Sequence, residues 1–322
     1  MQLERGVFLD LETLDRGDLD LGPLQDALGE WTFHAHTPPE RVAERLCGAQ
    51  VVVTNKVVLD AETLTAAPDL QLICVAATGT NNVDLVAARQ LGIPVCNVRD
   101  YATASVVQHV FTLILALTVQ LPRYDADVRA GAWSRSRQFC LLDHPVRELS
   151  GRRLGIIGHG VLGRATTRAA RAFGMEVAVA QSLAGGPPDP QRVPLDTLLA
   201  SSDVVSLHCP LTPQTQALMD ARRLAAMKSD ALLINTARGG IVDAAALADA
   251  LRQGVIGGAG IDVLEPEPPP ADHPLLAGDI PNLIVTPHVA WAALESRQRM
   301  VAGLADNIRA FREGQPRNLV NP

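Results

Sequence analysis

The stretch Leu154-Gly155-Ile156-Ile157-Gly158-His159-Gly160-Val161-Leu162-Gly163 decides the fold. Its first four residues are an apolar run typical of a buried strand, and a helical pattern follows from about Val161 to Phe173. The G-x-G-x-x-G spacing alone is a weak signal because glycine is common in turns, but the strand before it and the helix after it make it specific. The stretch therefore predicts a strand, a tight turn and a helix whose first N–H groups bind a dinucleotide pyrophosphate.

Each glycine of this turn has an expected role. Gly158 permits the tight turn, Gly160 lets the phosphates approach the backbone, and Gly163 lets the helix pack against the strand. The residues expected to line the same site between the glycines are His159, Val161 and Leu162. A glycine-rich turn without a ligand is the alternative, and the flanking pattern disfavours it.

Strand-length apolar runs continue on both sides of the turn and alternate with helical patterns. Six belong to the second half of the chain: 154–157, 177–179, 204–207, 232–234, 259–263 and 283–285. Four precede it: 7–9, 51–53, 72–75 and 93–95. Alternation of this kind predicts an α/β fold with two doubly wound parallel sheets, and six strands are the number of a dinucleotide-binding domain.

Length and composition agree with two domains. A chain of 322 residues exceeds one ordinary core, and 47% hydrophobic against 20% charged residues indicates a well-buried globular protein. Two lobes suggest a cleft between them. The net charge of −7 with scattered Lys and Arg argues against nucleic acid as a partner.

The N-terminus and the cysteines predict a cytoplasmic protein. The chain has neither the apolar segment of a signal peptide nor an 18-residue apolar span, so no membrane association is expected. The five cysteines are odd in number and far apart, which disfavours both a disulfide framework and a zinc site. We expect free, mostly buried thiols and no metal.

Three segments outside the strands have distinct patterns. Residues 103–120 are apolar almost all round, which predicts a long buried helix with Ser105 capping its start. Residues 123–151 lack strong periodicity and are expected to be an irregular connection. Residues 292–312 form an amphipathic helical pattern that is expected to return to the first lobe.

Gln181 stands where NAD-binding domains usually have an acidic residue, about 20 positions after the glycine turn. An amide can bind a ribose hydroxyl, but it lacks the charge with which a carboxylate repels the 2′-phosphate of NADP. No Lys or Arg lies between Gln181 and Arg192. The sequence therefore predicts that NAD is accepted, with weak discrimination against NADP.

Three polar residues follow three successive strands of the second sheet. Arg238 lies in the run Asn235–Asp243, where two glycines allow a ligand near the backbone, and its planar fork of donors suits a carboxylate. His288 follows the last strand and can give a proton to a ketone oxygen. Glu267 can orient that imidazole and favour its protonated form, although spacing alone does not separate Glu267 from Glu265.

Each of these three residues also has an ordinary interpretation: a surface arginine, a loop glutamate and a buried histidine with satisfied hydrogen bonds. Their placement after three strands of one sheet favours a site, because the carboxyl ends of parallel strands meet at one edge.

Four ordered motifs resemble the D-isomer-specific 2-hydroxyacid dehydrogenase family over essentially the whole chain. They are 158–163, 235–243, 262–268 and 286–288. The runs 76–84, 138–142 and 288–291 resemble its glycerate dehydrogenase (hydroxypyruvate reductase) branch. One departure lies in 105–109, where the family commonly has an acidic residue before the histidine and this chain has Gln108.

The resemblance implies a flavodoxin-like substrate domain over 1–101 and 290–322 and a Rossmann dinucleotide domain over 102–289. It selects Glu267 rather than Glu265 as the acid beside His288. The further cofactor contacts that it implies are Cys209, Pro210, Thr215, Thr236, Ala237 and Asp262. The substrate contacts that it implies are Thr78, Gly79, Thr80, Asn55, Lys56 and Trp291.

The activity implied is NAD(P)-dependent reduction of a small 2-keto acid, with hydroxypyruvate favoured and His288 as acid and base. Glyoxylate, phenylpyruvate and phosphohydroxypyruvate are alternative substrates, and a non-catalytic dinucleotide-sensing protein is an alternative class. The apolar helix over 103–120 and the segment after it resemble the family's dimer contact, so a homodimer is expected.

Overall fold

The computed structural model describes residues 3–187 and 189–322, which form two compact units. The first joins the N-terminal segment up to Ala102 with Ala292–Pro322, and the second is Thr103–Trp291. The domain boundaries predicted from the sequence, after residue 101 and after residue 289, lie within two residues of these positions.

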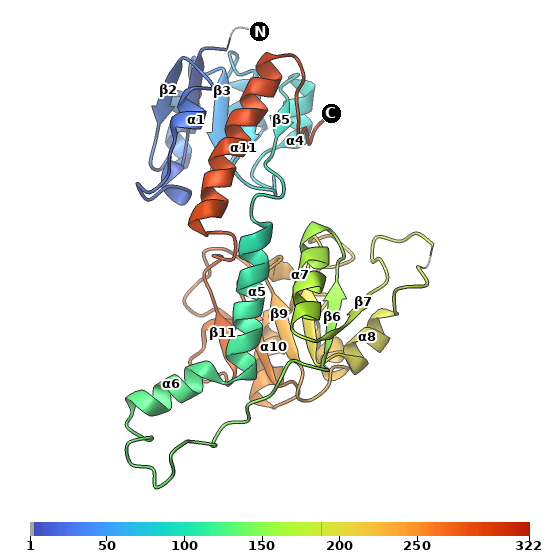
Figure 1. Ribbon diagram of the computed structural model, residues 1–322. Coiled ribbons are helices and arrows are strands. Elements are labelled where there is room, and N and C mark those ends of the chain that lie inside the picture. Colours follow the sequence, from blue (N-terminus) through green and yellow to red (C-terminus); the bar gives the residue numbers. More distant parts are fainter. Residues whose placement is uncertain (1–2, 188) are drawn as a thin grey trace. The chain divides into compact units, whose positions relative to one another are not determined.

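The first unit is a five-stranded parallel sheet with the strand order β2-β1-β3-β4-β5 (Figure 1). Its strands are β1 (Arg5–Phe8), β2 (Glu30–Phe33), β3 (Val51–Thr54), β4 (Leu72–Val75) and β5 (Val95–Cys96). This is the flavodoxin-like order. Strand β2 was not predicted because, as an edge strand, it buries no residue fully and gives only a weak apolar pattern.

Short helices cover this sheet, and one long helix completes the unit. They are α1 (Gly22–Gln25), α2 (Val42–Leu46), α3 (Ala61–Thr65), α4 (Leu85–Gln90) and α11 (Leu294–Arg312), with 3-10 turns at Leu11–Thr13 and Pro39–Arg41. Helix α11 comes from the C-terminal segment, and its buried Asn307 donates to the carbonyl of Asn97 at 2.8 Å. Its Arg297 pairs with Asp18, whose pKa this hydrogen bond lowers. The chain's two ends thus build one unit.

The second unit is a six-stranded parallel sheet with the order β11-β10-β9-β8-β6-β7. Its strands are β6 (Arg153–Ile157), β7 (Glu176–Val179), β8 (Val204–Leu207), β9 (Leu232–Asn235), β10 (Gly258–Ile261) and β11 (Leu283–Val285). Beyond β7, Ala180 and Val193 form a single parallel bridge. This bridge occupies the place of the third strand in the Rossmann order, so that strand is reduced to one residue pair.

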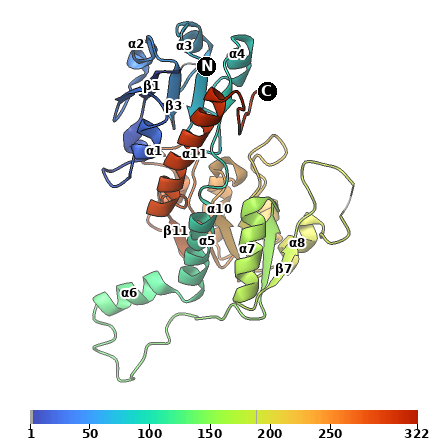
Figure 2. The ribbon, with the colours of Figure 1, turned by 45° about the horizontal axis from the view of Figure 1, so that its top comes forward.

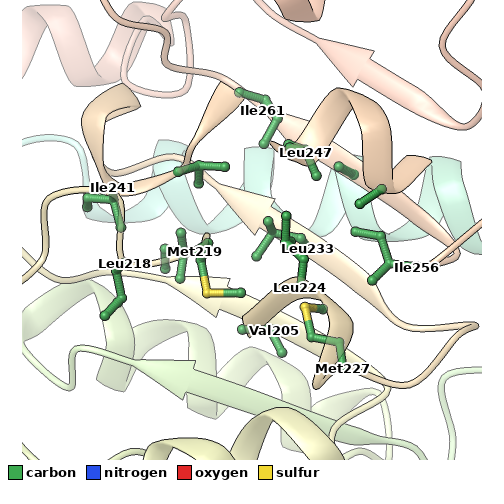
Figure 3. Close-up of a cluster of buried hydrophobic side chains, with 14 of the residues drawn as sticks. Val205, Leu218, Met219, Leu224, Met227, Leu233, Ile241, Leu247, Ile256 and Ile261 are labelled. Atoms are coloured by element: carbon green, nitrogen blue, oxygen red, sulfur yellow. The ribbon is translucent and has the colours of Figure 1, made fainter. Parts of the chain in front are cut away.

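Helices and 3-10 turns surround this sheet. They are α5 (Thr103–Thr118), α6 (Leu121–Arg129), α7 (Val161–Ala172), α8 (Leu195–Ser201), α9 (Ala221–Ala225) and α10 (Ala244–Arg252), with turns at Gly239–Ile241 and Pro274–Leu276. Their apolar faces meet the sheet in a core that includes Val205, Leu233 and Ile261, each at most 1% exposed (Figure 3). Such a core fixes the strand ends that carry the polar loops.

Two local expectations were wrong. The segment expected to be irregular begins with helix α6, whose first turn carries Pro122, a residue well suited to a helix start. Ser105 does not cap α5, because the helix begins at Thr103 and the Ser105 hydroxyl donates to the carbonyl of Ala290 at 2.6 Å. The loop after α6 extends away from the sheet of this unit (Figure 2).

In the described part of the chain, no single helix is long and apolar enough to cross a membrane, although the bent pair α5 and α6 passes that test by length and composition. The five cysteines are free, and Cys74, Cys96 and Cys209 are buried. Among residues 3–187 and 189–322, no group of three or more His, Cys, Asp or Glu side chains could hold a metal.

Candidate active site

Three neighbouring strands of the second sheet end at the same level. Ile261, the last residue of β10, is the register partner of Asn235 on β9 and of Val285 on β11. The loops that leave these three residues carry Arg238, Glu267 and His288 respectively. The parallel register therefore delivers the three predicted catalytic residues to one sheet edge.

His288 and Glu267 are in direct contact. The imidazole Nδ1 lies 2.6 Å from Glu267 Oε2, and both side chains are about one-third exposed. The other carboxylate oxygen accepts the N–H of Leu264 at 3.0 Å, which orients Glu267. With Nδ1 on the carboxylate, Nε2 is the ring atom left for a substrate oxygen, the arrangement that general acid–base chemistry needs. Glu265 makes no such contact with His288 among the described residues.

The backbone of His288 has a left-handed conformation, with φ at +53°. For a residue with a Cβ this costs about 1–2 kcal/mol, so surrounding contacts must hold it. The His288 N–H donates to the carbonyl of Asp262 at 2.8 Å, and the indole N–H of Trp291 donates to the His288 carbonyl at 2.9 Å. Trp291, predicted to contact substrate, is thus tied to the histidine's own backbone.

Arg238 lies on a loop that approaches the Glu267 loop closely. A Cβ on Gly239 would come within 2.2 Å of the Leu264 carbonyl carbon and oxygen, so only glycine allows these two loops to meet. Buried Asn235 braces the turn, since its amide donates to the Arg238 carbonyl at 2.9 Å and accepts the Ala237 N–H at 3.0 Å. The Arg238 side chain is exposed; its Nη1 donates to the Ala237 carbonyl at 2.7 Å, and the guanidinium has further N–H donors that suit an anion.

The glycine turn follows β6, beside β8, where the strand order reverses. Gly158 has φ at +94°, and a Cβ there would lie 2.5 Å from the backbone of His208 and Cys209. Gly160 caps the start of α7 and has no atom within 4 Å of the position of a Cβ, so the space in front of the helix N-terminus is open. An anion can therefore reach the first N–H groups of α7.

Gly163 makes a close contact that predicts the effect of a substitution. A Cβ at this position would lie 2.1 Å from the carbonyl oxygen of Gly158. We expect Gly163→Ala to displace helix α7 from the turn, lower the midpoint of thermal unfolding and weaken NADH binding at least about tenfold, since backbone must move to relieve the overlap. Calorimetry and a fluorescence titration with NADH check this. Gly278→Ala, at an exposed position with no atom within 4 Å of its Cβ, is the comparison outside the turn, and an unaltered NADH affinity in Gly163→Ala contradicts the assigned role.

Residues 111–290, more than half of the chain, match the family model described as D-isomer specific 2-hydroxyacid dehydrogenase, NAD binding domain. The chain belongs to the D-isomer specific 2-hydroxyacid dehydrogenase family. It is therefore an oxidoreductase of that family, and the predicted family and fold class are confirmed.

Relatives of this dehydrogenase family span nearly the whole chain. A glycerate dehydrogenase of Methylorubrum extorquens is 46% identical over 317 residues, covering 98% of both chains. A hydroxypyruvate reductase of Blautia hydrogenotrophica is 38% identical and covers 98% of this chain and 99% of its own. The crystal structure of a D-lactate dehydrogenase from Aquifex aeolicus, complexed with NAD and lactic acid, has a TM-score of 0.81 at 29% identity, covering 98% of this chain and 99% of that one.

The second unit of this dehydrogenase fits a dinucleotide. Besides the open space at Gly160, the Thr236 hydroxyl is buried at the catalytic sheet edge without a hydrogen-bond partner in the described chain. Buried polar groups normally have a partner, so this hydroxyl is suited to a ligand atom. The 210–215 loop is closed by a hydrogen bond from the Thr215 hydroxyl to the Pro210 carbonyl at 2.7 Å. The predicted contacts of Cys209, Pro210, Thr215 and Ala237 with the cofactor stay predictions.

The side chain of Gln181 makes hydrogen bonds to the backbone of a nearby loop, which the sequence did not predict. Its amide nitrogen donates to the carbonyls of Asp189 at 2.8 Å and Arg192 at 3.1 Å, and its amide oxygen accepts the Asp189 N–H at 3.1 Å. The side chain therefore closes the loop after β7, and both amide protons are already used. Its predicted contact with the ribose stays a prediction, for which the second lone pair of the amide oxygen is left.

Arg192 supplies positive charge beside the glycine turn. Burial lowers the pKa of His159, and the charges of Arg192, Arg164 and Arg171 lower it further. Arg192 is also paired with Asp189 at 3.2 Å. Sequence reasoning passed over Arg192 because it stands 11 residues beyond Gln181, and only the closed loop brings it back to the turn.

The predicted substrate residues of the first unit lie in two loops at strand ends. Buried Asp10 accepts the N–H groups of Asn55 at 2.9 Å and Lys56 at 2.6 Å, which fixes the loop after β3. Burial raises the pKa of Asp10, more than these hydrogen bonds lower it. In the loop after β4, the Thr78 hydroxyl donates to the Val98 carbonyl at 2.9 Å. The roles of Asn55, Lys56 and the 78–80 loop in substrate binding stay predictions.

Proposed function

We propose that this dehydrogenase reduces hydroxypyruvate to D-glycerate with NAD(P)H and catalyses the reverse oxidation. The observation that carries the proposal is the 2.6 Å contact between His288 Nδ1 and Glu267, on a sheet edge that also carries Arg238. The names of the two relatives, glycerate dehydrogenase and hydroxypyruvate reductase, support this choice among 2-keto acids.

The bound dinucleotide supplies the hydride for the carbonyl carbon. Arg238 binds the substrate carboxylate with its planar pair of donors and orients the neighbouring carbonyl. His288 donates a proton from Nε2 to the carbonyl oxygen as negative charge develops on it. Glu267 holds the ring in the tautomer with Nδ1–H on the carboxylate and stabilises the imidazolium before transfer. In oxidation the same Nε2 accepts the hydroxyl proton.

Glu267→Gln tests the pairing. An amide keeps the shape but removes the charge that stabilises the imidazolium, so the alkaline limb of the pH profile of kcat/KM for reduction should move to lower pH. Turnover at neutral pH should fall about 10-fold to 100-fold. Glu265→Gln, two residues away and without the contact, is the matched control. An unmoved profile in Glu267→Gln counts against the pairing.

We infer that the enzyme accepts both NADH and NADPH, with kcat/KM values within about 100-fold of each other. Gln181 carries no charge to repel a 2′-phosphate, and Arg192 lies close enough to influence His159. Arg192→Ala should therefore lower kcat/KM for NADPH more than for NADH, as steady-state kinetics with both cofactors will measure. Arg168→Ala, exposed on α7, is the control. A preference above about 100-fold for either cofactor contradicts the inference.

A panel of 2-keto acids with both cofactors tests the function as a whole. We expect the highest kcat/KM with hydroxypyruvate, followed by glyoxylate, and lower values with phenylpyruvate and phosphohydroxypyruvate. If another 2-keto acid gives a higher kcat/KM than hydroxypyruvate, that acid is the preferred substrate, and the assignment to the family is unaffected. No oxidation of NADH with any of them, in protein that binds NADH, supports instead a protein that only senses the dinucleotide.

We further propose a homodimer formed through the loop after α6. This loop exposes Phe139 and Leu142, at 91% and 80%, although large apolar side chains are rarely so accessible unless a partner covers them. The loop is ordered internally, since the indole N–H of Trp133 donates to the Phe139 carbonyl at 2.9 Å. Sedimentation of the Phe139→Asp/Leu142→Asp variant should give a monomer where the unaltered chain gives a dimer.

The predicted cytoplasmic location stays a prediction.

A further inference from the structure

Asp262 is the centre of a buried hydrogen-bond cluster beneath His288. Its side chain is 1% exposed and follows β10 directly. Its carboxylate accepts the hydroxyl of Thr286 at 2.6 Å and the N–H groups of Val289 at 3.0 Å and Ala290 at 2.9 Å. A buried carboxylate is stable only when such donors surround it. Burial raises the pKa of Asp262, but the hydrogen bonds outweigh this effect, so the pKa lies below its ordinary value.

His109, on helix α5, completes the cluster. Its Nε2 lies 2.9 Å from the hydroxyl oxygen of Thr286 and 3.4 Å from Asp262 Oδ1. The single proton of Thr286 is directed to the carboxylate, which can only accept, so Nε2 of His109 must carry a proton and donate it. His109 therefore donates a hydrogen bond to the Thr286 hydroxyl oxygen from a second element, helix α5.

The cluster holds the backbone on both sides of His288. The Asp262 carbonyl accepts the His288 N–H, and the Asp262 carboxylate binds the next two amides, of Val289 and Ala290. The Ala290 carbonyl in turn accepts the hydroxyl of Ser105, one turn before His109 on α5. These bonds span the left-handed residue, whose conformation would otherwise relax.

We propose that His109 is a positioning residue for catalysis: by anchoring Asp262 and Thr286, it keeps the backbone of His288 left-handed and its imidazole on Glu267. The inference rests on the proposed function of His288 as acid and base. This proposal gives the motif at 105–109 a role in the reaction, in addition to the roles of the glycine turn and of the three catalytic residues.

His109→Leu removes the donor at similar volume, whereas His109→Gln places an amide N–H at the reach of the lost Nε2–H. We expect His109→Leu to lower kcat about 10-fold to 100-fold while the Kd of NADH changes less than about twofold. His109→Gln should recover most of the activity. Gln108→Ala, exposed on the same helix and outside the cluster, is the matched control and should behave like the unaltered chain.

Two measurements separate positioning from plain stability. If His109 acts through the Glu267–His288 pair, the kcat losses of His109→Leu and Glu267→Gln should be clearly less than additive in the double variant. Deuterium exchange of the peptide containing Val289 and Ala290 should be faster in His109→Leu than in Gln108→Ala, and this readout does not depend on activity.

Each result decides. Equal kcat in His109→Leu and Gln108→Ala overturns the proposal, as do additive losses or a failure of His109→Gln to restore turnover. If the unaltered enzyme binds NADH but reduces no 2-keto acid, the proposed function fails. In that case, unchanged deuterium exchange at 289–290 in His109→Leu also overturns the proposal that His109 holds this backbone. Faster deuterium exchange supports that His109 holds the backbone, without a role in the reaction.

Discussion

Turnover should fall about 10³-fold when His288 is replaced by alanine, and about as far when it is replaced by asparagine. Both changes remove the proton donor. Asparagine also tolerates the left-handed backbone that His288 adopts at φ +53°, so it keeps the loop in place while alanine strains it. Equal losses in the two variants assign the effect to the ring rather than to the backbone. Single-turnover kinetics with NADH and hydroxypyruvate measure it.

The control for this prediction is cofactor binding. The Kd of NADH should stay within about threefold in His288→Asn, since the glycine turn and the start of α7 are untouched. His36→Asn, an exposed histidine of the first unit, should leave kcat unaltered. If His288→Asn retains the turnover of the unaltered enzyme, another group supplies the proton.

Arg238→Ala should lower kcat/KM for the keto acid about 10³-fold. Two charge-assisted hydrogen bonds to a carboxylate contribute about 1.5–3 kcal/mol each, and every 1.4 kcal/mol corresponds to about a factor of ten. Arg238→Lys should recover only part of the loss, because an ammonium keeps the charge but lacks the planar fork. Most of the change should appear in KM for the keto acid.

Arg222→Ala serves as the comparison, because Arg222 is an exposed arginine on another element, helix α9. The Kd of NADH in Arg238→Ala should be close to that of the unaltered chain. If Arg238→Ala raises KM for every cofactor and substrate alike, the arginine supports the loop rather than the carboxylate.

The sequence predicted best what depends on repetition along the chain. Buried strands such as 72–75 are continuous apolar runs, and polar residues follow the ends of several such strands in the loops. This is why Arg238, Glu267 and His288 could be proposed together. Edge strand β2 and helix α6 bury few side chains, so their sequences show weak periodicity and they were missed.

Contacts between distant segments could not be read from the sequence. The pairing of Ser105 with Ala290 joins residues 185 positions apart, and that of His109 with Thr286 joins residues 177 apart. The role of Gln181 was hidden for another reason. Its spacing from the glycine turn suits a ribose, but a neighbouring loop competes for its amide and satisfies it first.

That closed loop has a consequence for protein engineering. Exchanging one residue after the second strand is a common way to switch a dehydrogenase between coenzymes, but here Gln181→Asp would also remove two donated bonds to the loop backbone. The new carboxylate would face the carbonyls that the amide now binds. A successful switch would therefore require redesign of the loop together with its first residue, as one transplanted segment.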